Sequence, residues 1–314
     1  MIFMITRKEF NFNSSDGISN IYGCIWIDEN KKEYKGIVQL IHGMAEHILR
    51  YENFACFLAS KGYVVCGNDH IGHGRSAKNI DDLGYFGEGK YNYVKLIKDI
   101  HHVNVMVKNM FPKLPITVIG HSMGSFLGRS FVYRYPEYIK SAVFIGTSGS
   151  NPLIATGIKI CSIKMDRGKG KERGNFVNKL AFGAYNSRYE NKNTDFDWIC
   201  SDDNVVNEFI EDEKCGFIFT YAGYNDLFSV LKEVSSKEWY KGFDKRIPVL
   251  LVSGSEDPVG NFGKGVREVY RKLKKECVDT DIVIYKGMRH EVLNEKNKFK
   301  VYSDIEKWIC KKMI

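Results

Sequence analysis

Ser122 lies at the centre of Gly-His-Ser-Met-Gly at residues 120–124, a pentapeptide that fits the pattern G-x-S-x-G. A short β-branched apolar run precedes it, and a helical run follows it as far as Pro136. A strand, a tight turn and a helix are the context in which this pattern exposes a serine hydroxyl. The start of the helix also offers free N–H groups to a developing negative charge. The stretch therefore predicts nucleophilic catalysis by Ser122.

A serine hydroxyl is a poor nucleophile until a base takes its proton, and the base needs an acid to orient it. In a chain of this layout the order is serine, acid, histidine. Of the eight histidines only His290 follows Ser122, and it lies just after the last expected strand. Asp257 follows an earlier strand end, so we expect Ser122, Asp257 and His290 to form a catalytic triad. Glu256 is the nearest rival for the acid, and Asp226 is a more remote one.

Two backbone N–H groups should hold the negative charge that develops on the substrate carbonyl oxygen. One is the amide of Met123, directly after the nucleophile. The other should come from the loop at residues 42–47, which follows an early strand, and Met44 is the expected donor. The histidines of this loop and the polar residues of a later glycine-rich loop are interpreted as hydrogen-bonded supports rather than metal ligands: His42, His47, Asp69, His70 and His73. We expect neither a metal nor an organic cofactor.

Apolar runs alternate with amphipathic segments along most of the chain, which predicts a mostly parallel sheet with helices on both faces. A β-hairpin is expected over residues 1–30, from strands at 2–12 and 20–27. Further strands are expected at 36–41, 63–66, 116–119, 141–145, 247–252 and 281–285, and helices at 51–61, 91–111, 263–275 and 298–309. The pattern breaks in a mostly helical, aromatic-rich segment. We therefore expect a core formed by residues 1–149 and 237–314, with residues 150–236 inserted as a helical cap.

Composition limits the class of protein. The 314 residues are 44% hydrophobic, enough for one large α/β domain, and the net charge of +8 forms no basic stripe interleaved with aromatic residues. Nucleic acid is therefore not an expected partner. The eight cysteines form no C-x-x-C pair, which favours free thiols in a reducing compartment. The N-terminus reaches charges too soon for a signal peptide, and no run approaches the roughly 20 apolar residues of a membrane span. We expect a cytoplasmic protein, and the sequence leaves its oligomeric state open.

Five motifs together carry a family resemblance: His42-Gly43-x-x-Glu46-His47, Asp69-x-x-Gly72-His73-Gly74-x-Ser76, Gly120-His121-Ser122-Met123-Gly124, Gly254-x-x-Asp257-Pro258 and Arg289-His290-Glu291. The chain resembles the α/β-hydrolase fold family, and within it the monoglyceride lipase and lysophospholipase-like group, which also includes serine-aminopeptidase-like hydrolases. The resemblance implies hydrolysis of lipid-type esters by the expected triad, with the amides of Met44 and Met123 as the oxyanion hole. Met44 departs from the monoglyceride lipases, which more often have a small residue there, and this bears on the substrate rather than on the chemistry.

The substrate is less constrained than the reaction. The aromatic residues of the cap either line an acyl pocket or form the cap's own core. The basic segment at residues 164–173 is either a solvated loop or a contact for lipid headgroups, so a transient contact with a membrane surface stays open. The expected partner is a small-molecule or lipid ester.

The alternative reading is a serine aminopeptidase of the proline-iminopeptidase type, which needs an acidic pocket for the amine of its substrate. The cap supplies acids for one, although a solvated helix face also accounts for them: Asp202, Asp203, Glu208, Glu211, Asp212 and Glu213. A non-catalytic relative would lack a member of the triad, and none is lacking here. Dehalogenase and epoxide hydrolase chemistry needs an acid at the position of Ser122.

Overall fold

An eight-stranded sheet forms the centre of the protein in the computed structural model, which describes residues 5–189 and 192–313. The spatial order is β1-β2-β4-β3-β5-β6-β7-β8. Strands β3 to β8 all pair in parallel with their neighbours among themselves. At one side of the sheet β1 pairs antiparallel with β2, and β2 pairs antiparallel with β4. Their bounds are Ile5–Asn13, Asn20–Asp28, Gly36–Ile41, Tyr63–Asn68, Ile116–His121, Ser141–Ile145, Val249–Gly254 and Thr280–Tyr285 for β1 to β8. The predicted mostly parallel sheet is confirmed; residues 2–4 of the expected first strand lie outside the described residues.

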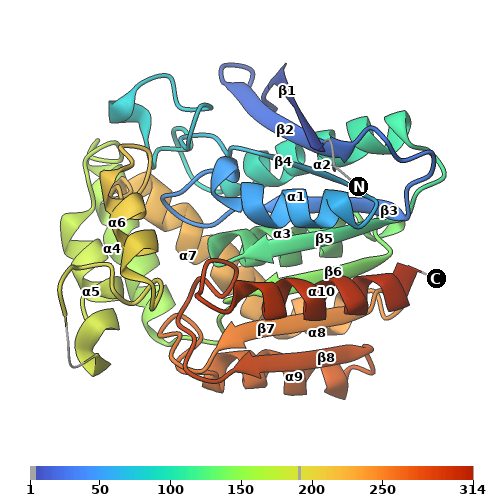
Figure 1. The fold of residues 1–314 in the computed structure, drawn as a ribbon. Helices are drawn as coiled ribbons and strands as arrows, with labels where there is room; N and C mark the ends of the chain where they lie inside the picture. Colours follow the sequence, from blue (N-terminus) through green and yellow to red (C-terminus); the bar gives the residue numbers. More distant parts are fainter. Residues whose placement is uncertain (1–4, 190–191, 314) are drawn as a thin grey trace.

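Helices cover both faces of the sheet (Figure 1). Helices α1 (Glu52–Ser60) and α10 (Lys298–Met313) pack on one face. Helices α2 (Tyr93–Met110), α3 (Met123–Arg134) and α9 (Lys264–Lys275) pack on the other. Short 3₁₀ turns lie at Ile48–Tyr51, Ile80–Asp82, Pro136–Tyr138 and Tyr185–Arg188. The expected helices are all present, with ends that differ by a few residues.

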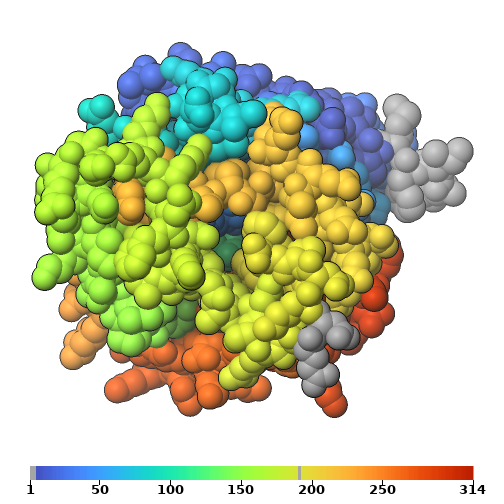
Figure 2. Space-filling model, turned by 90° about the vertical axis from the view of Figure 1, so that its left-hand side faces the viewer, coloured from blue at the N-terminus to red at the C-terminus, as the bar shows by residue number. Residues whose placement is uncertain are grey.

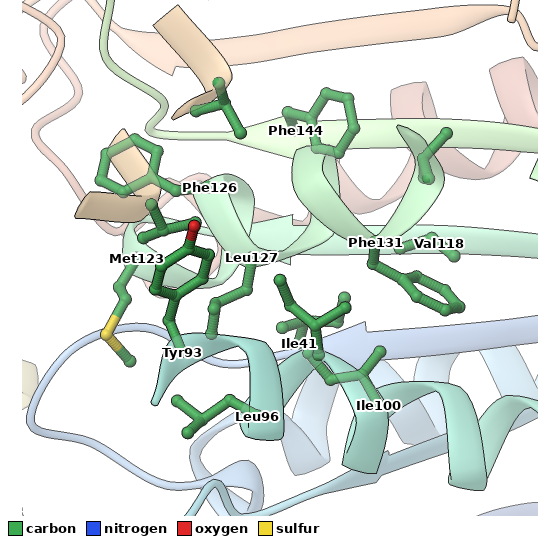
Figure 3. Close-up of a cluster of buried hydrophobic side chains, with 14 of the residues drawn as sticks. Ile41, Tyr93, Leu96, Ile100, Val118, Met123, Phe126, Leu127, Phe131 and Phe144 are labelled. Carbon is green, nitrogen blue, oxygen red and sulfur yellow. The ribbon is translucent and has the colours of Figure 1, made fainter. Parts of the chain in front are cut away.

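The hydrophobic core consists of two layers because successive side chains of a strand point to opposite faces. In β3, Ile37 and Ile41 pack with α2 and α3, whereas Val38 and Leu40 pack with α1 and α10. Figure 3 shows the first layer, in which Leu127 of α3 points towards α2. Each such side chain contributes about 1.5–3 kcal/mol when fully buried. This packing fixes the strands whose C-terminal ends carry the candidate site.

A helical segment separates β6 from β7. It contains α4 (Leu153–Asp166), α5 (Asn175–Phe182), α6 (Asp203–Glu211), α7 (Tyr221–Ser235) and α8 (Lys237–Gly242). Figure 1 shows α4, α5 and α6 beyond the C-terminal ends of the parallel strands. Viewed from that side, Figure 2 shows a hollow between the lime-green and yellow parts of this segment, with darker atoms of the core at its floor. The segment thus forms a cover over one edge of the sheet.

The basic segment at residues 164–173 is not a solvated loop throughout. Its last residue, Arg173, donates hydrogen bonds to the backbone oxygens of Ile80, Asp81, Leu83 and Ile218. This end of the segment is therefore held against the backbone of two other loops, because a planar guanidinium can satisfy several carbonyl groups at once. Among the described helices, none has both the length and the apolar composition to cross a membrane.

Candidate active site

The predicted tight turn at Ser122 is present, and its backbone is strained. Ser122 has φ +52° and ψ −122°, between the end of β5 and the first residue of α3. A positive φ is rare for a residue other than glycine and is held only where the surroundings enforce it. The flanking glycines allow the close approach of the helix. A Cβ on Gly120 would lie 2.2 Å from the oxygen of Gly124, and one on Gly124 would lie 2.1 Å from the oxygen of Ile41.

Asp257 and His290 are hydrogen-bonded to each other. The Nδ1 of His290 lies 2.9 Å from the Oδ1 of Asp257, and both side chains are buried. The amide of Val259 also donates to Oδ1, and the hydroxyl of Ser253 donates to Oδ2, which fixes the carboxylate after β7. Since Nδ1 faces the carboxylate, Nε2 is the ring nitrogen that remains to exchange a proton. His290 and Ser122 line the same cavity.

The rival acids lie elsewhere. The side chain of Glu256 is exposed and accepts a hydrogen bond from the hydroxyl of Ser255. Asp226 is buried in α7, where it accepts the amide of Tyr93 at 3.3 Å. Neither residue lines the cavity that contains Ser122. Of the candidate acids, only Asp257 contacts His290 among the described residues.

The loop at residues 42–47 passes directly over Ser122. A Cβ on Gly43 would lie 3.1 Å from the Cβ of Ser122 and 2.5 Å from the Oε1 of Glu46. Ala45 has φ +52°, so the loop turns sharply here. Met44 and Met123, the two expected oxyanion donors, line the cavity together with Ser122. The structure thus brings four of the five predicted residues to one cavity, with Asp257 directly behind His290.

A buried charged network connects the parts of this site, and it was not predicted from the sequence. The carboxylate of Glu46 accepts the amide of Gly43 at 2.5 Å, the hydroxyl of Tyr51 at 2.7 Å and the guanidinium of Arg50 at 2.9 Å. Its Oε1 also lies 3.3 Å from the Nδ1 of His121. Burial favours a raised pKa for Glu46, but His121 and Arg50 outweigh burial and hold this pKa well below its ordinary value.

His121 links this network to His290. Its Nε2 lies 3.3 Å from the backbone oxygen of His290, and the two rings lie 4.6 Å apart. Burial favours a lowered pKa for His121, but Glu46 outweighs burial and raises this pKa above its ordinary value. The only local signal for the network is the spacing of Glu46 and Arg50, four residues apart.

The helical cover is hydrogen-bonded to the loop of His290. The amide of His290 donates to the oxygen of Trp198 at 3.4 Å, and that of Glu291 donates to the oxygen of Ile199 at 2.7 Å. Arg289 donates to the oxygen of Cys200 at 2.9 Å. The covering segment therefore helps to hold the loop that carries His290.

Gly146, just after β6, is a second residue whose role sequence reasoning missed. It has φ +59°, and a Cβ there would lie 2.8 Å from the Cε1 of His290. The absence of a side chain therefore leaves room for the imidazole. A glycine directly after a predicted strand was the available signal.

The histidines between residues 42 and 73 fall into two groups. His42, His70 and His73 are buried next to one another, and burial lowers the pKa of His70 to about 4 and that of His73 to about 3. His42 bonds to the oxygen of Gly43 and accepts the amide of His70, which agrees with a role in supporting the loop.

The second group has the side chains that could hold a metal ion. The ligand atoms of His47, Asp212 and Cys215 all lie within 4.8 Å of one another. A 2.8 Å hydrogen bond between His47 and Asp212 accounts for much of this proximity, and none of the three residues lines the cavity. Sequence spacing missed the cluster because 165 residues separate His47 from Asp212.

The cavity above Ser122 has a volume of about 1000 Å³. Many aromatic residues of the cover line it: Phe182, Tyr185, Phe196, Trp198, Phe209, Phe217 and Phe228. Others, such as Phe219, are buried within the cover instead. The aromatic residues therefore serve in part as cavity wall and in part as core. None of the six acids named for a peptidase pocket lines the cavity, whereas Asp195 of the same segment does.

Comparison with known proteins finds similar chains over most of the length of this one. The family model described as serine aminopeptidase, S33, matches residues 32–297. The monoacylglycerol lipase of Mycolicibacterium smegmatis is 27% identical over 97% of both chains. The human monoglyceride lipase is 26% identical over 88% of this chain and 83% of its own. The solved structure of a thermostable carboxyl esterase from Bacillus coagulans in complex with glycerol has a TM-score of 0.92 at 27% identity, covering 98% of this chain and 99% of that one.

These matches extend over most of the sheet and over the helical cover, so they concern the whole arrangement rather than one motif. The order of the strands, the tight turn between β5 and α3 and the position of the helices are those of the α/β-hydrolase fold. The chain belongs to the serine aminopeptidase S33 family of α/β hydrolases.

Proposed function

We propose that the protein is a serine hydrolase that cleaves carboxylic esters of lipid type, such as monoacylglycerols or lysophospholipids. The observation that carries the proposal is the 2.9 Å hydrogen bond between His290 and Asp257 in the wall of the cavity that Ser122 lines. Relatives named as monoacylglycerol lipases and as a carboxyl esterase support the ester as the reacting group.

In this proposal the hydroxyl of Ser122 attacks the ester carbonyl while the Nε2 of His290 accepts its proton. Asp257 orients the imidazole and stabilises its charged form. The amides of Met44 and Met123 hold the oxyanion, and His290 returns the proton to the departing alcohol. In the second half of the reaction His290 accepts a proton from water, which attacks the carbonyl of the acyl-enzyme. The bond to Ser122 then breaks, His290 returns the proton to the serine oxygen, and the carboxylic acid leaves.

We also propose that residues 150–236 act as a cap on a core formed by residues 1–149 and 237–314. The aromatic lining of the cavity supports this division, because it offers an apolar wall to an acyl chain. Peptide hydrolysis is the alternative within the family. None of the six acids considered for an amine pocket lines the cavity, whereas Asp195 of the same segment and Glu268 of α9 do.

The test is hydrolysis of p-nitrophenyl esters from short to long chains, beside monoacylglycerol, lysophospholipid and aminoacyl-amide substrates. We expect hydrolysis of the longer esters, and a loss on the order of 10⁶-fold in kcat in Ser122→Ala. Turnover of the amides but not of the esters would instead support the peptidase alternative.

A further inference from the structure

One end of the cavity differs in character from its aromatic part. There α9 and the loop at residues 148–151 form the wall, and α9 contributes Lys264, Glu268 and Arg271. These three residues are spaced by four and three positions, so they lie along one stripe of the helix. The lining of this end is polar and charged, which suits the alcohol part of an ester rather than its acyl chain.

Positive charge at this end is not compensated within the described part of the chain. Neither Lys264 nor Arg271 forms an ion pair with a described residue. The acid between them, Glu268, is already engaged, because it pairs with Lys272 at 2.7 Å and accepts the hydroxyl of Ser150 at 2.6 Å. The stripe therefore presents two cations without an ion-pair partner to the cavity, and the carboxylate between them is bound through its Oε1 to Lys272 and Ser150.

The position of Lys264 is unfavourable for the helix itself. Lys264 is the first residue of α9, the first turn contains no acidic residue, and Gly263 before it provides no side-chain cap. The positive end of the helix dipole disfavours a cation there by about 0.3–1 kcal/mol. A cation that destabilises the start of its own helix, with no acidic residue in the first turn to compensate, points to a role in function.

We propose that Lys264 and Arg271 form a subsite for an anionic group on the alcohol side of the ester. This inference rests on the proposed ester hydrolysis and narrows its substrate class to acyl esters whose alcohol carries a phosphate. Phosphate oxygens form strong charge-assisted hydrogen bonds with lysine and arginine side chains. The aromatic cavity then takes the acyl chain, and the α9 subsite takes the headgroup.

The test compares three soluble substrates with the same acyl chain: 1-hexanoylglycerol 3-phosphate, 1-hexanoylglycerol and hexanoylcholine. The variants are Lys264→Glu and Arg271→Glu, measured as the ratio of KM for the phosphate ester to KM for the neutral ester. Arg267→Glu is the matched control, because Arg267 is an exposed cation of the same helix that does not line the cavity.

We expect the wild-type protein to have its lowest KM for the phosphate ester and its highest for hexanoylcholine. Each cavity variant should raise the KM ratio about tenfold or more, the loss expected for a charge-assisted bond, whereas Arg267→Glu should not change it. An unchanged ratio in both cavity variants, or an equal change in Arg267→Glu, would overturn the subsite. Absence of hydrolysis of all three esters by the wild-type protein would instead contradict the proposed function.

Discussion

Arg50 and Glu291 form a buried, two-pronged ion pair that joins the loop before α1 to the loop that carries His290. The two nitrogen–oxygen distances are 2.5 and 2.8 Å, and the residues are 241 positions apart in the chain. Arg50 also binds Glu46, which accepts the amide of Gly43 in the loop above Ser122. The pair therefore connects the expected oxyanion loop with the expected base.

Removing one charge of this pair should destabilise the protein. Glu291→Gln leaves a buried guanidinium with one carboxylate partner instead of two, and breaking a buried pair costs about 3–5 kcal/mol. We expect a loss of about 3 kcal/mol in the free energy of unfolding, measured by urea denaturation. Glu88→Gln is the control, because Glu88 is exposed and forms no ion pair with a described residue. Equal stability of the two variants would contradict the role of the pair.

The contact between His121 and Glu46 should make stability depend on pH. The pKa of His121 is raised above 6.5 in the folded state. Its contribution to the free energy of unfolding is therefore fully present below pH 6.5 and is lost as pH rises through the folded-state pKa. The pKa of Glu46 is lowered, so its contribution is present above 4.5 and is lost as pH falls through its folded-state pKa. Glu46→Gln should therefore flatten the fall in stability between pH 6 and pH 8, measured by denaturation at both values. An unchanged slope would show that another group titrates.

Asp226 should lower stability at neutral and alkaline pH. Burial raises its pKa to about 7 from 3.8, and its Oδ2 has no hydrogen-bond partner among the described residues. The folded state therefore keeps the proton longer than the unfolded state, and stability falls as pH rises from about 4 to about 7. Asp226→Asn should be more stable than the wild-type protein at pH 8, by on the order of 1.4 kcal/mol per unit of pKa shift, and nearly equal to it at pH 4. A variant less stable than the wild type at pH 8 would rule this out.

Asp257 should act by orienting His290. Asp257→Asn keeps the size of the side chain but favours the wrong tautomer of the imidazole, which in a serine triad costs on the order of 10⁴-fold in kcat. We expect such a loss of kcat with little change in KM, measured with a soluble p-nitrophenyl ester. Glu256→Gln is the control and should retain activity, because its side chain points to solvent. The reverse result would assign the acid to Glu256.

Candidate site residues that directly follow a strand could be placed from the sequence. Ser122, Asp257 and His290 each follow a parallel strand, and the C-terminal ends of parallel strands meet at one edge of a sheet. Chain order and the single histidine after Ser122 then selected His290 as the expected base. The strained φ of Ser122 followed from the tight turn between strand and helix.

The contacts between distant loops could not be located in this way. Arg50 and Glu291 belong to separate loops, and no periodic pattern links residues 241 positions apart. The same holds for Arg289 and the backbone of residues 197–200. The basic run that ends at Arg173 has the composition of a solvated loop, yet tertiary contacts with carbonyl groups determine its position.

The most direct test of the central claim is the site of covalent labelling by a long-chain alkyl fluorophosphonate. Such a reagent reacts with an activated serine and mimics the acyl-enzyme step. We expect intact-protein mass spectrometry to find one adduct per chain, peptide mapping to place it on Ser122, and Ser122→Ala to remain unlabelled while ester hydrolysis is lost. An adduct on another residue, or ester hydrolysis at the wild-type rate in Ser122→Ala, would contradict the proposed mechanism.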